Sequence, residues 1–422
     1  MYYVDLLWNP QDGAGLSRKD RAAGTFRAFV PDELDLALPR ISDEANQAAT
    51  DALAVLARAD ERIGTKSGYL NHLLIRSESI SSSWIEGNRV TPKKLAIAEV
   101  LHQGKSVALD VIANVRATEE SIDVLADRTR PVSVSDIEHL QHVIEPSLPA
   151  GIRREQNWVG GNGWSPLRAD FVPPPETEVR RLLDNLAQFV SATEGNPVVR
   201  AALAHAQFET IHPFIDGNGR TGRALIHTVL KRSDALRNIL VPISTVFAGN
   251  RDSYIDGLTD FRADRVDDWI VGFSRAAEQA ASNAVELAQD ITQLDGVLLD
   301  QLLAYRTESG LSPAQPRRGA VIVGVLKNLA SEPVLTAERV AATYGVSTVA
   351  AQGALNQLGE AGILSRTKDH KGRLVCWTSD RHLGLVALTE RSNRIGGGDT
   401  SDGKPRHAPA APDIDAVGQL RN

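Results

Sequence analysis

The sequence predicts a mainly α-helical protein, and three observations support this fold class. Hydrophobic residues make up 42% of the chain and charged residues 23%, as in an ordinary globular protein. Aromatic residues reach only 5%, so alanine and leucine must fill most of the core, and both favour helices. Apolar residues also recur at helical spacing, for example over residues 43–63 and 177–193. With 422 residues, the chain has room for two or three domains.

Charge and cysteine content exclude several classes of protein. The net charge of −7 does not suggest a protein that binds nucleic acid or a membrane surface, although a local basic patch could exist. Cys376 is the only cysteine, which rules out an intramolecular disulfide and disfavours a cysteine-based metal site. Residues 1–10 lack the pattern of a signal peptide, and no apolar run is long enough to span a membrane. We therefore expect a cytoplasmic protein without a membrane partner.

The first third of the chain should begin irregularly and continue as two helices. Glycine, proline and aspartate are scattered through residues 1 to about 40, so we expect no regular element there. Ser42 is a candidate N-cap for a helix over residues 43–63. A second helix is expected over residues 68–86, where leucines, an isoleucine and Trp84 form a buried stripe. It should stop at Gly87.

The middle of the chain combines further helices with one segment of different composition. Two helices are expected over residues 93–130, and Ser133 or Ser135 can cap the next one. Residues 153–175 are rich in glycine, proline and tryptophan, and Asn162-Gly163 within them is typical of a β-hairpin turn. The predicted strands of this hairpin contain Trp158-Val159 and Phe171-Val172, and helices over 177–193 and 197–211 follow.

Residues 211–223, which read I-H-P-F-I-D-G-N-G-R-T-G-R, carry the strongest local signal. Pro213 should end the preceding helix because it has no amide hydrogen. Gly217 and Gly219 are expected to allow positive φ in a tight turn, after which a helix restarts over residues 220–231. A glycine-rich turn that leads into a helix N-terminus is a ready anion site.

The side chains of this stretch point to chemistry on a nucleotide. Arg220 and Arg223 lie three residues apart on one helical face and could grip a polyphosphate together. Asp216 suits Mg²⁺, which takes one or two carboxylates plus phosphate oxygens. His212 is the only group in the stretch that can accept a proton near neutral pH. Together these residues predict a transfer reaction on a nucleotide.

These residues resemble the motif of the Fic family, H-x-F-x-(D/E)-G-N-G-R-x-x-R, at every fixed position. The resemblance implies a helical-bundle core that transfers AMP from ATP onto a hydroxyl group of a target protein. It implies that His212 deprotonates the hydroxyl and that Asp216 holds Mg²⁺. It also implies a set of phosphate-binding residues, with Arg220 and Arg223 on the β and γ phosphates: Gly217, Asn218, Gly219, Arg220 and Arg223.

A second stretch, Ser82 to Gly87, is similar to the family's inhibitory motif (S/T)-x-x-x-E-(G/N). The resemblance implies that Glu86 pairs with Arg223 and occupies the place of the γ phosphate. Competition between one carboxylate and a phosphate for the same guanidinium is physically plausible. Residues 250–255 resemble a segment that often carries two adjacent tyrosines near the base, but here Tyr254 is followed by Ile255, which leaves the adenine pocket unassigned.

Residues 153–175 resemble the flap of Fic domains, whose edge holds an extended target segment by main-chain pairing. Such strand addition would fix the target hydroxyl near His212 and make little demand on the target's sequence. The alternative is a hairpin that only covers the core.

The C-terminal part predicts a separate module. Three helices over 319–330, 336–344 and 348–361 precede a pair of strands over 363–367 and 373–378, an order similar to a winged helix-turn-helix. Its third helix offers Gln352, Asn356 and Gln357 but no lysine or arginine, so dimerisation or target docking competes with DNA binding as its role.

The sequence therefore predicts a Fic core with a small β-hairpin flap and a winged helix-turn-helix domain. The expected function is protein adenylylation with ATP and Mg²⁺, restrained by Glu86. Removal of AMP by the same site, and a DNA-binding regulator that uses the core as a nucleotide sensor, are the alternatives. The expected parts are an N-terminal helical region (1–92), a catalytic core (93–290), a helix end and linker (291–318), the winged-helix module (319–380) and a mostly disordered tail (381–422).

Overall fold

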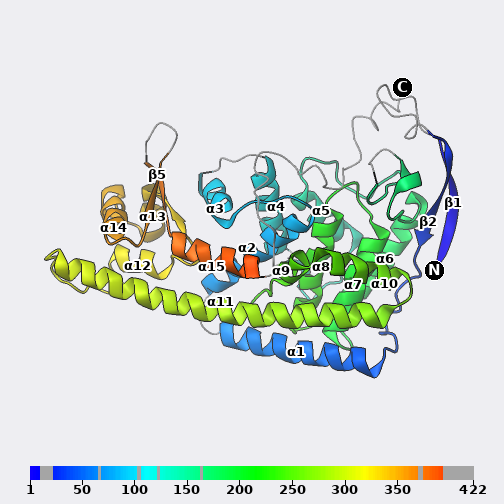
Figure 1. The fold of residues 1–422 in the computed structure, drawn as a ribbon, viewed down its shortest axis with the longest axis horizontal. Helices are drawn as coiled ribbons and strands as arrows, with labels where there is room; N and C mark the ends of the chain where they lie inside the picture. The colour runs from blue at the N-terminus through cyan, green and yellow to red at the C-terminus, as the bar shows by residue number, and fades with distance from the viewer. Residues whose placement is uncertain are drawn as a thin grey trace.

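The computed structural model describes residues 1–9, 22–64, 68–101, 106–120, 124–161, 165–368 and 374–392. These residues form a mainly α-helical protein, as the sequence predicts (Figure 1). The helices of the first half are α1 (Asp43–Gly64), α2 (Gly68–Ile85), α3 (Pro92–Leu101), α4 (Ser106–Glu120), α5 (Val134–Ile144), α6 (Glu176–Ser191), α7 (Pro197–Ile211) and α8 (Asn218–Arg232). Those that follow are α9 (Ile243–Gly249), α10 (Arg251–Arg262), α11 (Val266–Glu308), α12 (Val321–Lys327), α13 (Ala337–Tyr344), α14 (Thr348–Glu360) and α15 (Asp380–Ser392).

Helix α7 lies at the centre of the largest hydrophobic core. Every residue of α7 from Val198 to Ile211 is buried, and its neighbours α6 and α8 cover it on different sides. Phe208 and Phe214 pack against each other where α7 ends, with ring centroids 6.1 Å apart. The helix that leads to His212 is therefore held rigidly along its whole length.

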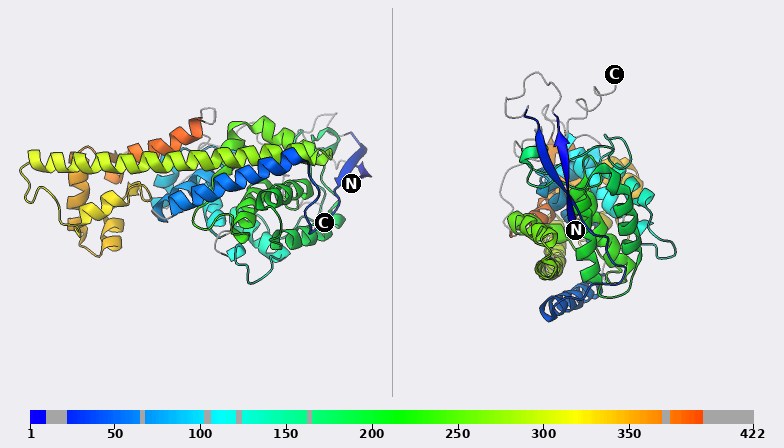
Figure 2. Two further views of the ribbon diagram at one scale, coloured as in Figure 1. Left: turned by 90° about the horizontal axis from the view of Figure 1, so that it is seen from below. Right: turned by 90° about the vertical axis from the view of Figure 1, so that its right-hand side faces the viewer.

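The long helix α11 joins the two parts of the molecule. Its first half lies along α1, and small buried residues such as Ala49 and Ala280 let the two backbones approach closely (Figure 2). Its second half contributes Leu298 and Leu302 to a separate core formed with α12, α13 and α14. One helix thus fixes how the C-terminal part is attached to the rest.

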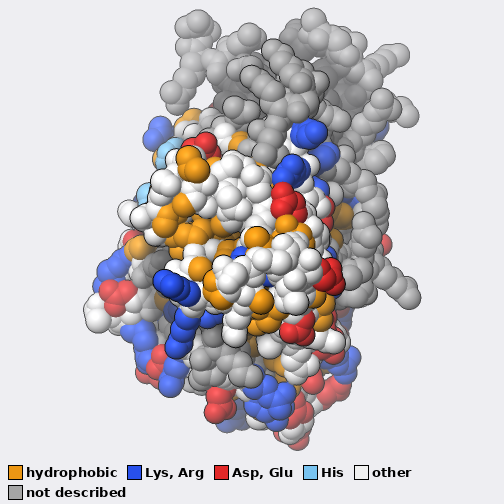
Figure 3. Space-filling model, turned by 90° about the vertical axis from the view of Figure 1, so that its left-hand side faces the viewer, with side chains coloured by type: hydrophobic (Ala, Val, Ile, Leu, Met, Phe, Trp, Pro, Cys, Tyr) orange, Lys and Arg blue, Asp and Glu red, His pale blue; other side chains and the backbone are white. Residues whose placement is uncertain are grey.

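The C-terminal part contains the three helices and the two strands that the sequence predicts. Strands β4 (Ser365–Lys368) and β5 (Leu374–Thr378) pair antiparallel, and a short unpredicted strand β3 (Val334–Leu335) pairs with the other edge of β5. Figure 3 shows this end of the molecule, where lysine and arginine side chains lie mainly toward the margins of the face. Val349 in the first turn of α14 is 83% exposed. The winged-helix assignment and its role stay predictions.

The first part of the segment 381–422, which is predicted to be mostly disordered, is helical. Residues 380–392 form α15, which packs against α3, α9 and α11. Leu383 lies in a small core with Ala96, and Asp380 pairs with Lys93 at 2.7 Å. Residues 393–422 lie outside the described residues.

The prediction that residues 1 to about 40 are irregular is wrong for residues 2–8 and 24–30, whereas residues 31–42 contain no helix or strand. Strands β1 (Tyr2–Trp8) and β2 (Gly24–Val30) pair antiparallel in full register. Phe26 and Ala28 of β2 are buried against Val172, and the amide of Phe29 donates a hydrogen bond to the Val172 carbonyl at 2.9 Å. A contact with a distant segment therefore stabilises these strands, and local sequence could not reveal it.

The hairpin predicted in residues 153–175 is reduced to one antiparallel bridge in the described residues, between Val159 and Phe171. Asn162 and Gly163 lie outside those residues, and Pro166–Arg168 form a short 3₁₀ helix. None of the helices in the described ranges is both long and apolar enough to span a lipid bilayer.

Candidate active site

His212 caps the C-terminal end of α7 in a left-handed conformation, with φ 48° and ψ 59°. Its amide still bonds the Phe208 carbonyl at 2.9 Å, and Pro213 then ends the helix, as predicted. The His212 carbonyl accepts hydrogen bonds from Arg153 Nε at 3.0 Å and from Asn157 Nδ2 at 3.2 Å. Residues from the start of the 153–175 segment therefore hold the backbone that presents the imidazole.

The imidazole of His212 is neutral at neutral pH. Burial, together with the positive charge of Arg153, lowers its pKa to about 4. A neutral ring keeps a lone pair that can accept a proton. The structure thus gives His212 the protonation state that a general base requires.

The turn after His212 is closed by Asn218. The Asn218 side chain is buried, accepts the Phe214 amide at 2.9 Å and donates to the Phe214 carbonyl at 2.8 Å. Gly217 has a φ of +79°, as predicted, and α8 begins at Asn218. At this helix start the first amides have no intrahelical acceptor, so an anion contact from Asn218 would use its backbone.

Gly219 does not take the positive φ that the sequence predicts, because it lies within the first turn of α8. Glycine is needed there for space. A β carbon at this position would lie only 1.9 Å from Glu86 Oε1. The second glycine of the motif therefore makes room for the carboxylate of Glu86.

Asp216 contributes one partly exposed carboxylate beside this turn. Its Oδ1 accepts the Gly217 amide at 2.6 Å, and its carbonyl accepts Gln141 Nε2 at 3.1 Å. In the part of the chain that the structure describes, no three His, Cys, Asp or Glu side chains cluster as a metal site. A single carboxylate still fits Mg²⁺ when nucleotide phosphates supply further oxygens.

Arg220 is buried and pairs with Glu145, a residue that the sequence reasoning did not single out. The distance from Arg220 Nη2 to Glu145 Oε2 is 2.8 Å. Burial alone lowers the pKa of Arg220, but the carboxylates of Asp216 and Glu145 raise it above its ordinary value. Glu145 lies 75 positions from Arg220, and no sequence pattern connects them.

Arg223 is 1% exposed and is held by Ser82 of α2 and by Glu86, which directly follows α2. Its Nε and Nη2 donate to the hydroxyl and the carbonyl of Ser82, each at 2.9 Å, and Nη2 also donates to Glu86 Oε1 at 2.8 Å. The contact between Glu86 and Arg223 that the family resemblance implies is therefore present. Its inhibitory role stays a prediction.

Glu86 is ionised in this arrangement. Burial favours the neutral carboxyl group, but the charge and hydrogen bond of Arg223 outweigh burial and lower the Glu86 pKa below its ordinary value. Gly87 then ends α2 with a φ of +86°. The end of α2 thus delivers a negative charge to the start of α8.

Helices α2 and α8 meet in contacts that repeat every four residues and run in opposite directions. Glu86 lies over Gly219, Ser82 bonds Arg223, and Glu78 Oε1 lies 3.0 Å from His227 Nε2. The Glu78 carboxylate also accepts the Ser244 amide at 2.9 Å. These buried polar contacts fix the register of α2 on α8, and with it the position of Glu86.

A second buried acid lies one turn before His212. Burial raises the pKa of Glu209 to about 7, and the charge of Glu86 raises it as well. The neighbouring His205 bonds Tyr254 at 2.9 Å, and burial lowers the His205 pKa to about 3. His205 is therefore a buried, hydrogen-bonded residue. Ile255, which follows Tyr254 where the family's segment often has a second tyrosine, is 41% exposed.

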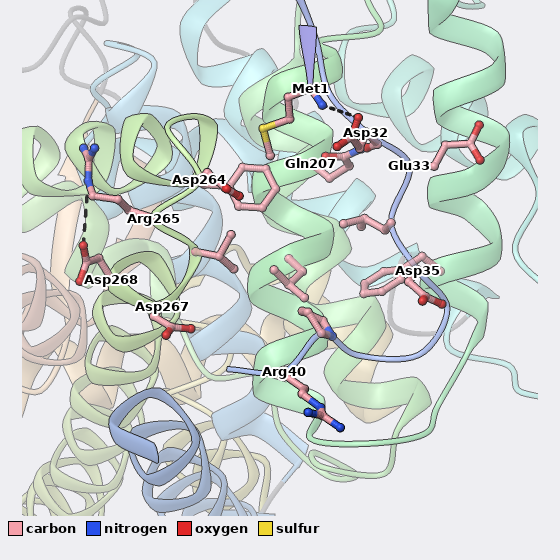
Figure 4. Close-up of a pocket in the computed structure, with 16 residues that line it drawn as sticks. Met1, Asp32, Glu33, Asp35, Arg40, Gln207, Asp264, Arg265, Asp267 and Asp268 are labelled. Atoms are coloured by element: carbon pink, nitrogen blue, oxygen red, sulfur yellow. Dashed lines mark hydrogen bonds and ion pairs between the residues drawn. The ribbon is translucent and has the colours of Figure 1, made fainter. Parts of the chain in front are cut away.

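A pocket of about 600 Å³ lies elsewhere, and none of the predicted site residues lines it (Figure 4). Its wall contains aspartates at 32, 35, 264, 267 and 268 together with Glu33. Arg40, Arg265 and the amine of Met1 also line it, but carboxylates outnumber these cations, so the wall does not favour a polyphosphate.

Comparison with known proteins places this site in a family. Residues 131–230 match the Fic/DOC family. Proteins named Protein adenylyltransferase Fic from Drosophila willistoni and Drosophila grimshawi are each 28% identical over 243 residues, which are 55% of this chain. The match spans 44% and 46% of those relatives, less than half their length. The part of this chain that matches the Fic/DOC family thus begins just before α5 and ends within the last turn of α8.

Two solved structures are also similar. A Fic family protein from Desulfovibrio desulfuricans G20 has a TM-score of 0.48 and 19% identity, over 81% of this chain and 97% of that one. Fic-1 from C. elegans has a TM-score of 0.44 and 18% identity, over 58% of this chain and 72% of that one.

Replacing Asn218 by alanine tests whether this side chain closes the turn. The variant loses both bonds to Phe214 and leaves a buried amide without an acceptor, so its free energy of unfolding should fall by about 1–3 kcal/mol. Urea unfolding measures the change. Asn185→Ala is the matched control, because Asn185 makes the same pair of bonds to Leu34 at a more accessible place. A loss no larger than that of the control would contradict this role.

Proposed function

We propose that this protein transfers AMP from ATP to a serine, threonine or tyrosine hydroxyl of a target protein. The observation that carries the proposal is the grouping of a neutral His212, the Asp216 carboxylate and the buried Arg220 and Arg223 around one helix start. The names of the Drosophila relatives support the same activity.

The reaction follows from the chemistry of these groups. The hydroxyl oxygen of the target attacks the α phosphorus of ATP, and His212 accepts the hydroxyl proton. The bond from the α phosphorus to the bridging oxygen breaks, and pyrophosphate leaves. His212 can act in this way because its pKa of about 4 keeps it unprotonated in the free protein at neutral pH.

The protein's other contribution is to place and balance the charge of the triphosphate. The free amides at the start of α8 and the guanidinium groups of Arg220 and Arg223 all lie at this helix end. Asp216 would hold Mg²⁺, which when bound neutralises phosphate charge. Catalysis then consists mainly of alignment and electrostatic stabilisation.

Glu86 restrains this activity in the proposal. Its carboxylate takes up Arg223 and fills the space above Gly219, so a γ phosphate cannot reach the same guanidinium. Activation requires that the end of α2 give up this contact.

The target would bind at the 153–175 segment by strand addition. Arg153 and Asn157 join the base of this segment to the His212 backbone, which keeps a bound chain close to the imidazole. The Val172 carbonyl already accepts the Phe29 amide of β2. The amide and the carbonyl of Val159 are bonded to Phe171 and Asp170, so a target would pair with other backbone groups of the segment.

Label transfer from α-labelled ATP in the presence of Mg²⁺ tests the proposed activity. We expect label on the protein or on a target band with Glu86→Gly, at least about tenfold more than with the wild type, because Arg223 becomes available to the γ phosphate. The Glu86→Gly/His212→Ala variant should lose the label. Label that survives in this double variant would contradict the base assignment, and no label in any form would contradict AMP transfer.

The pH dependence of kcat/KM for ATP tests the protonation state of His212, because this ratio reports the free enzyme. The pKa of His212 lies near 4. The negative charge of Glu86 raises this pKa, so a variant without that charge has a still lower His212 pKa. On the acidic side of the pH profile, where His212 becomes protonated, the kcat/KM of Glu86→Gly should therefore stay constant from pH 8 down to about pH 5.5. It should fall only at more acidic pH. Half-loss near pH 6.5, as for an unperturbed histidine, would contradict the account.

A further inference from the structure

We propose that Glu145, at the C-terminal end of α5, is a positioning residue that holds Arg220 ready for the diphosphate part of the nucleotide. The inference rests on the proposed function, because it deepens the assignment of Arg220 as a phosphate ligand. It concerns a residue outside both motifs of the sequence.

The Glu145 carboxylate is fixed from two sides. Its Oε2 accepts Arg220 Nη2 at 2.8 Å, and its Oε1 accepts the Ser147 hydroxyl at 2.7 Å. The side chains of Arg220 and Glu145 are 2% and 11% exposed, so water screens this ion pair little. The Glu145 amide continues the α5 hydrogen-bond pattern by bonding the Gln141 carbonyl at 2.8 Å. Arg220 is therefore tied to the end of a well-formed helix.

The two arginines of the motif differ in which donors remain for a ligand. On Arg223, Ser82 and Glu86 take up both Nε and Nη2. On Arg220, Glu145 takes only Nη2, and the buried Nε and Nη1 have no hydrogen-bond partner. A buried donor without an acceptor costs about 1–3 kcal/mol, so these two nitrogens point to an oxygen-rich ligand. Glu145 thus leaves two donors of Arg220 available to a ligand, whereas Ser82 and Glu86 occupy donors of Arg223.

The charge around Arg220 explains why a buried guanidinium is stable here before a ligand binds. The carboxylates of Asp216 and Glu145 both favour the charged form. The C-terminal end of α5 also carries partial negative charge from its last carbonyls. Without Glu145, the guanidinium would lose its only hydrogen bond to a described side chain and would be free to rotate.

The same end of α5 also supports the rest of the turn. Gln141 donates to the Asp216 carbonyl at 3.1 Å. A β carbon on Gly217 would lie 3.6 Å from the Glu145 β carbon, which is ordinary van der Waals contact. The end of α5 therefore contacts the Asp216 backbone, Gly217 and Arg220, and it forms one wall of the proposed phosphate site.

Binding of ADP and of AMP, each with Mg²⁺ and measured by calorimetry, tests the inference. The parent is the full-length Glu86→Gly protein, and Glu145→Ala and Glu145→Gln are made in it. Glu145→Ala should weaken ADP at least about tenfold and AMP less than about twofold, because only ADP carries the phosphate that Arg220 reaches. Glu145→Gln keeps an acceptor for Arg220 and should stay within about threefold of the parent for both ligands. Asp184→Ala is the control, since it breaks the surface pair with Arg180 and should change neither affinity.

Three outcomes would overturn the positioning role. If Glu145→Ala binds ADP more tightly, Glu145 competes with phosphate. If it binds ADP and AMP equally more weakly, Glu145 has a general structural role. If its binding is unchanged, Glu145 has no role in nucleotide binding. The test is independent of label transfer. Selective loss of ADP affinity without transfer activity would leave this inference standing and overturn the proposed function, whereas a parent that binds neither nucleotide would overturn both.

Discussion

The buried guanidinium of Arg223 is the constraint on which the account depends. A cation taken out of water needs an anionic or strongly polar partner, because an unpaired buried charge is very costly. In this structure Ser82 and Glu86 provide that partner. ATP would provide another in its γ phosphate. Under the proposed function these two partners exclude each other, and the need of Arg223 for one of them would couple the end of α2 to nucleotide binding.

The surrounding fold fixes the positions of His212 and Glu86 relative to Arg223. Helix α7 is buried on all sides, and its end holds His212 in a left-handed conformation that Arg153 and Asn157 secure through its carbonyl. The register of α2 on α8 is set by Glu78, Ser82 and Glu86 together. Because Glu78 anchors α2 further back, the Glu86 carboxylate leaves Arg223 only when the Glu86 side chain rotates or the last turn of α2 moves.

Local patterns predicted most of the helices and the turn between two helices at residues 211–223, because helical periodicity and a contiguous motif are both short-range signals. The chemistry of that stretch stays a prediction. They failed where a contact between distant segments decides the structure. Strand β2 depends on Val172, and α15 depends on Ala96 of α3. Glu145 was missed for the same reason, since its role follows from a contact across 75 positions. The sequence predicts that glycine is needed at position 219 for a positive φ, but the structure shows that it is needed to leave space for the Glu86 carboxylate.

The competition for Arg223 can be measured directly with inorganic tripolyphosphate, which carries no base and needs no catalysis. The measurement is calorimetry on the wild type, on Glu86→Gln and on Glu86→Gln/Arg223→Ala. Glu86→Gln keeps the shape of the side chain and removes its charge, and the double variant also removes the guanidinium. The account predicts that Glu86→Gln binds tripolyphosphate at least about tenfold more tightly than the wild type, since a neutral amide is a weaker partner for a guanidinium. The double variant should lose this gain. Equal affinity of the wild type and Glu86→Gln would contradict the claim that the Glu86 carboxylate and a phosphate compete for Arg223.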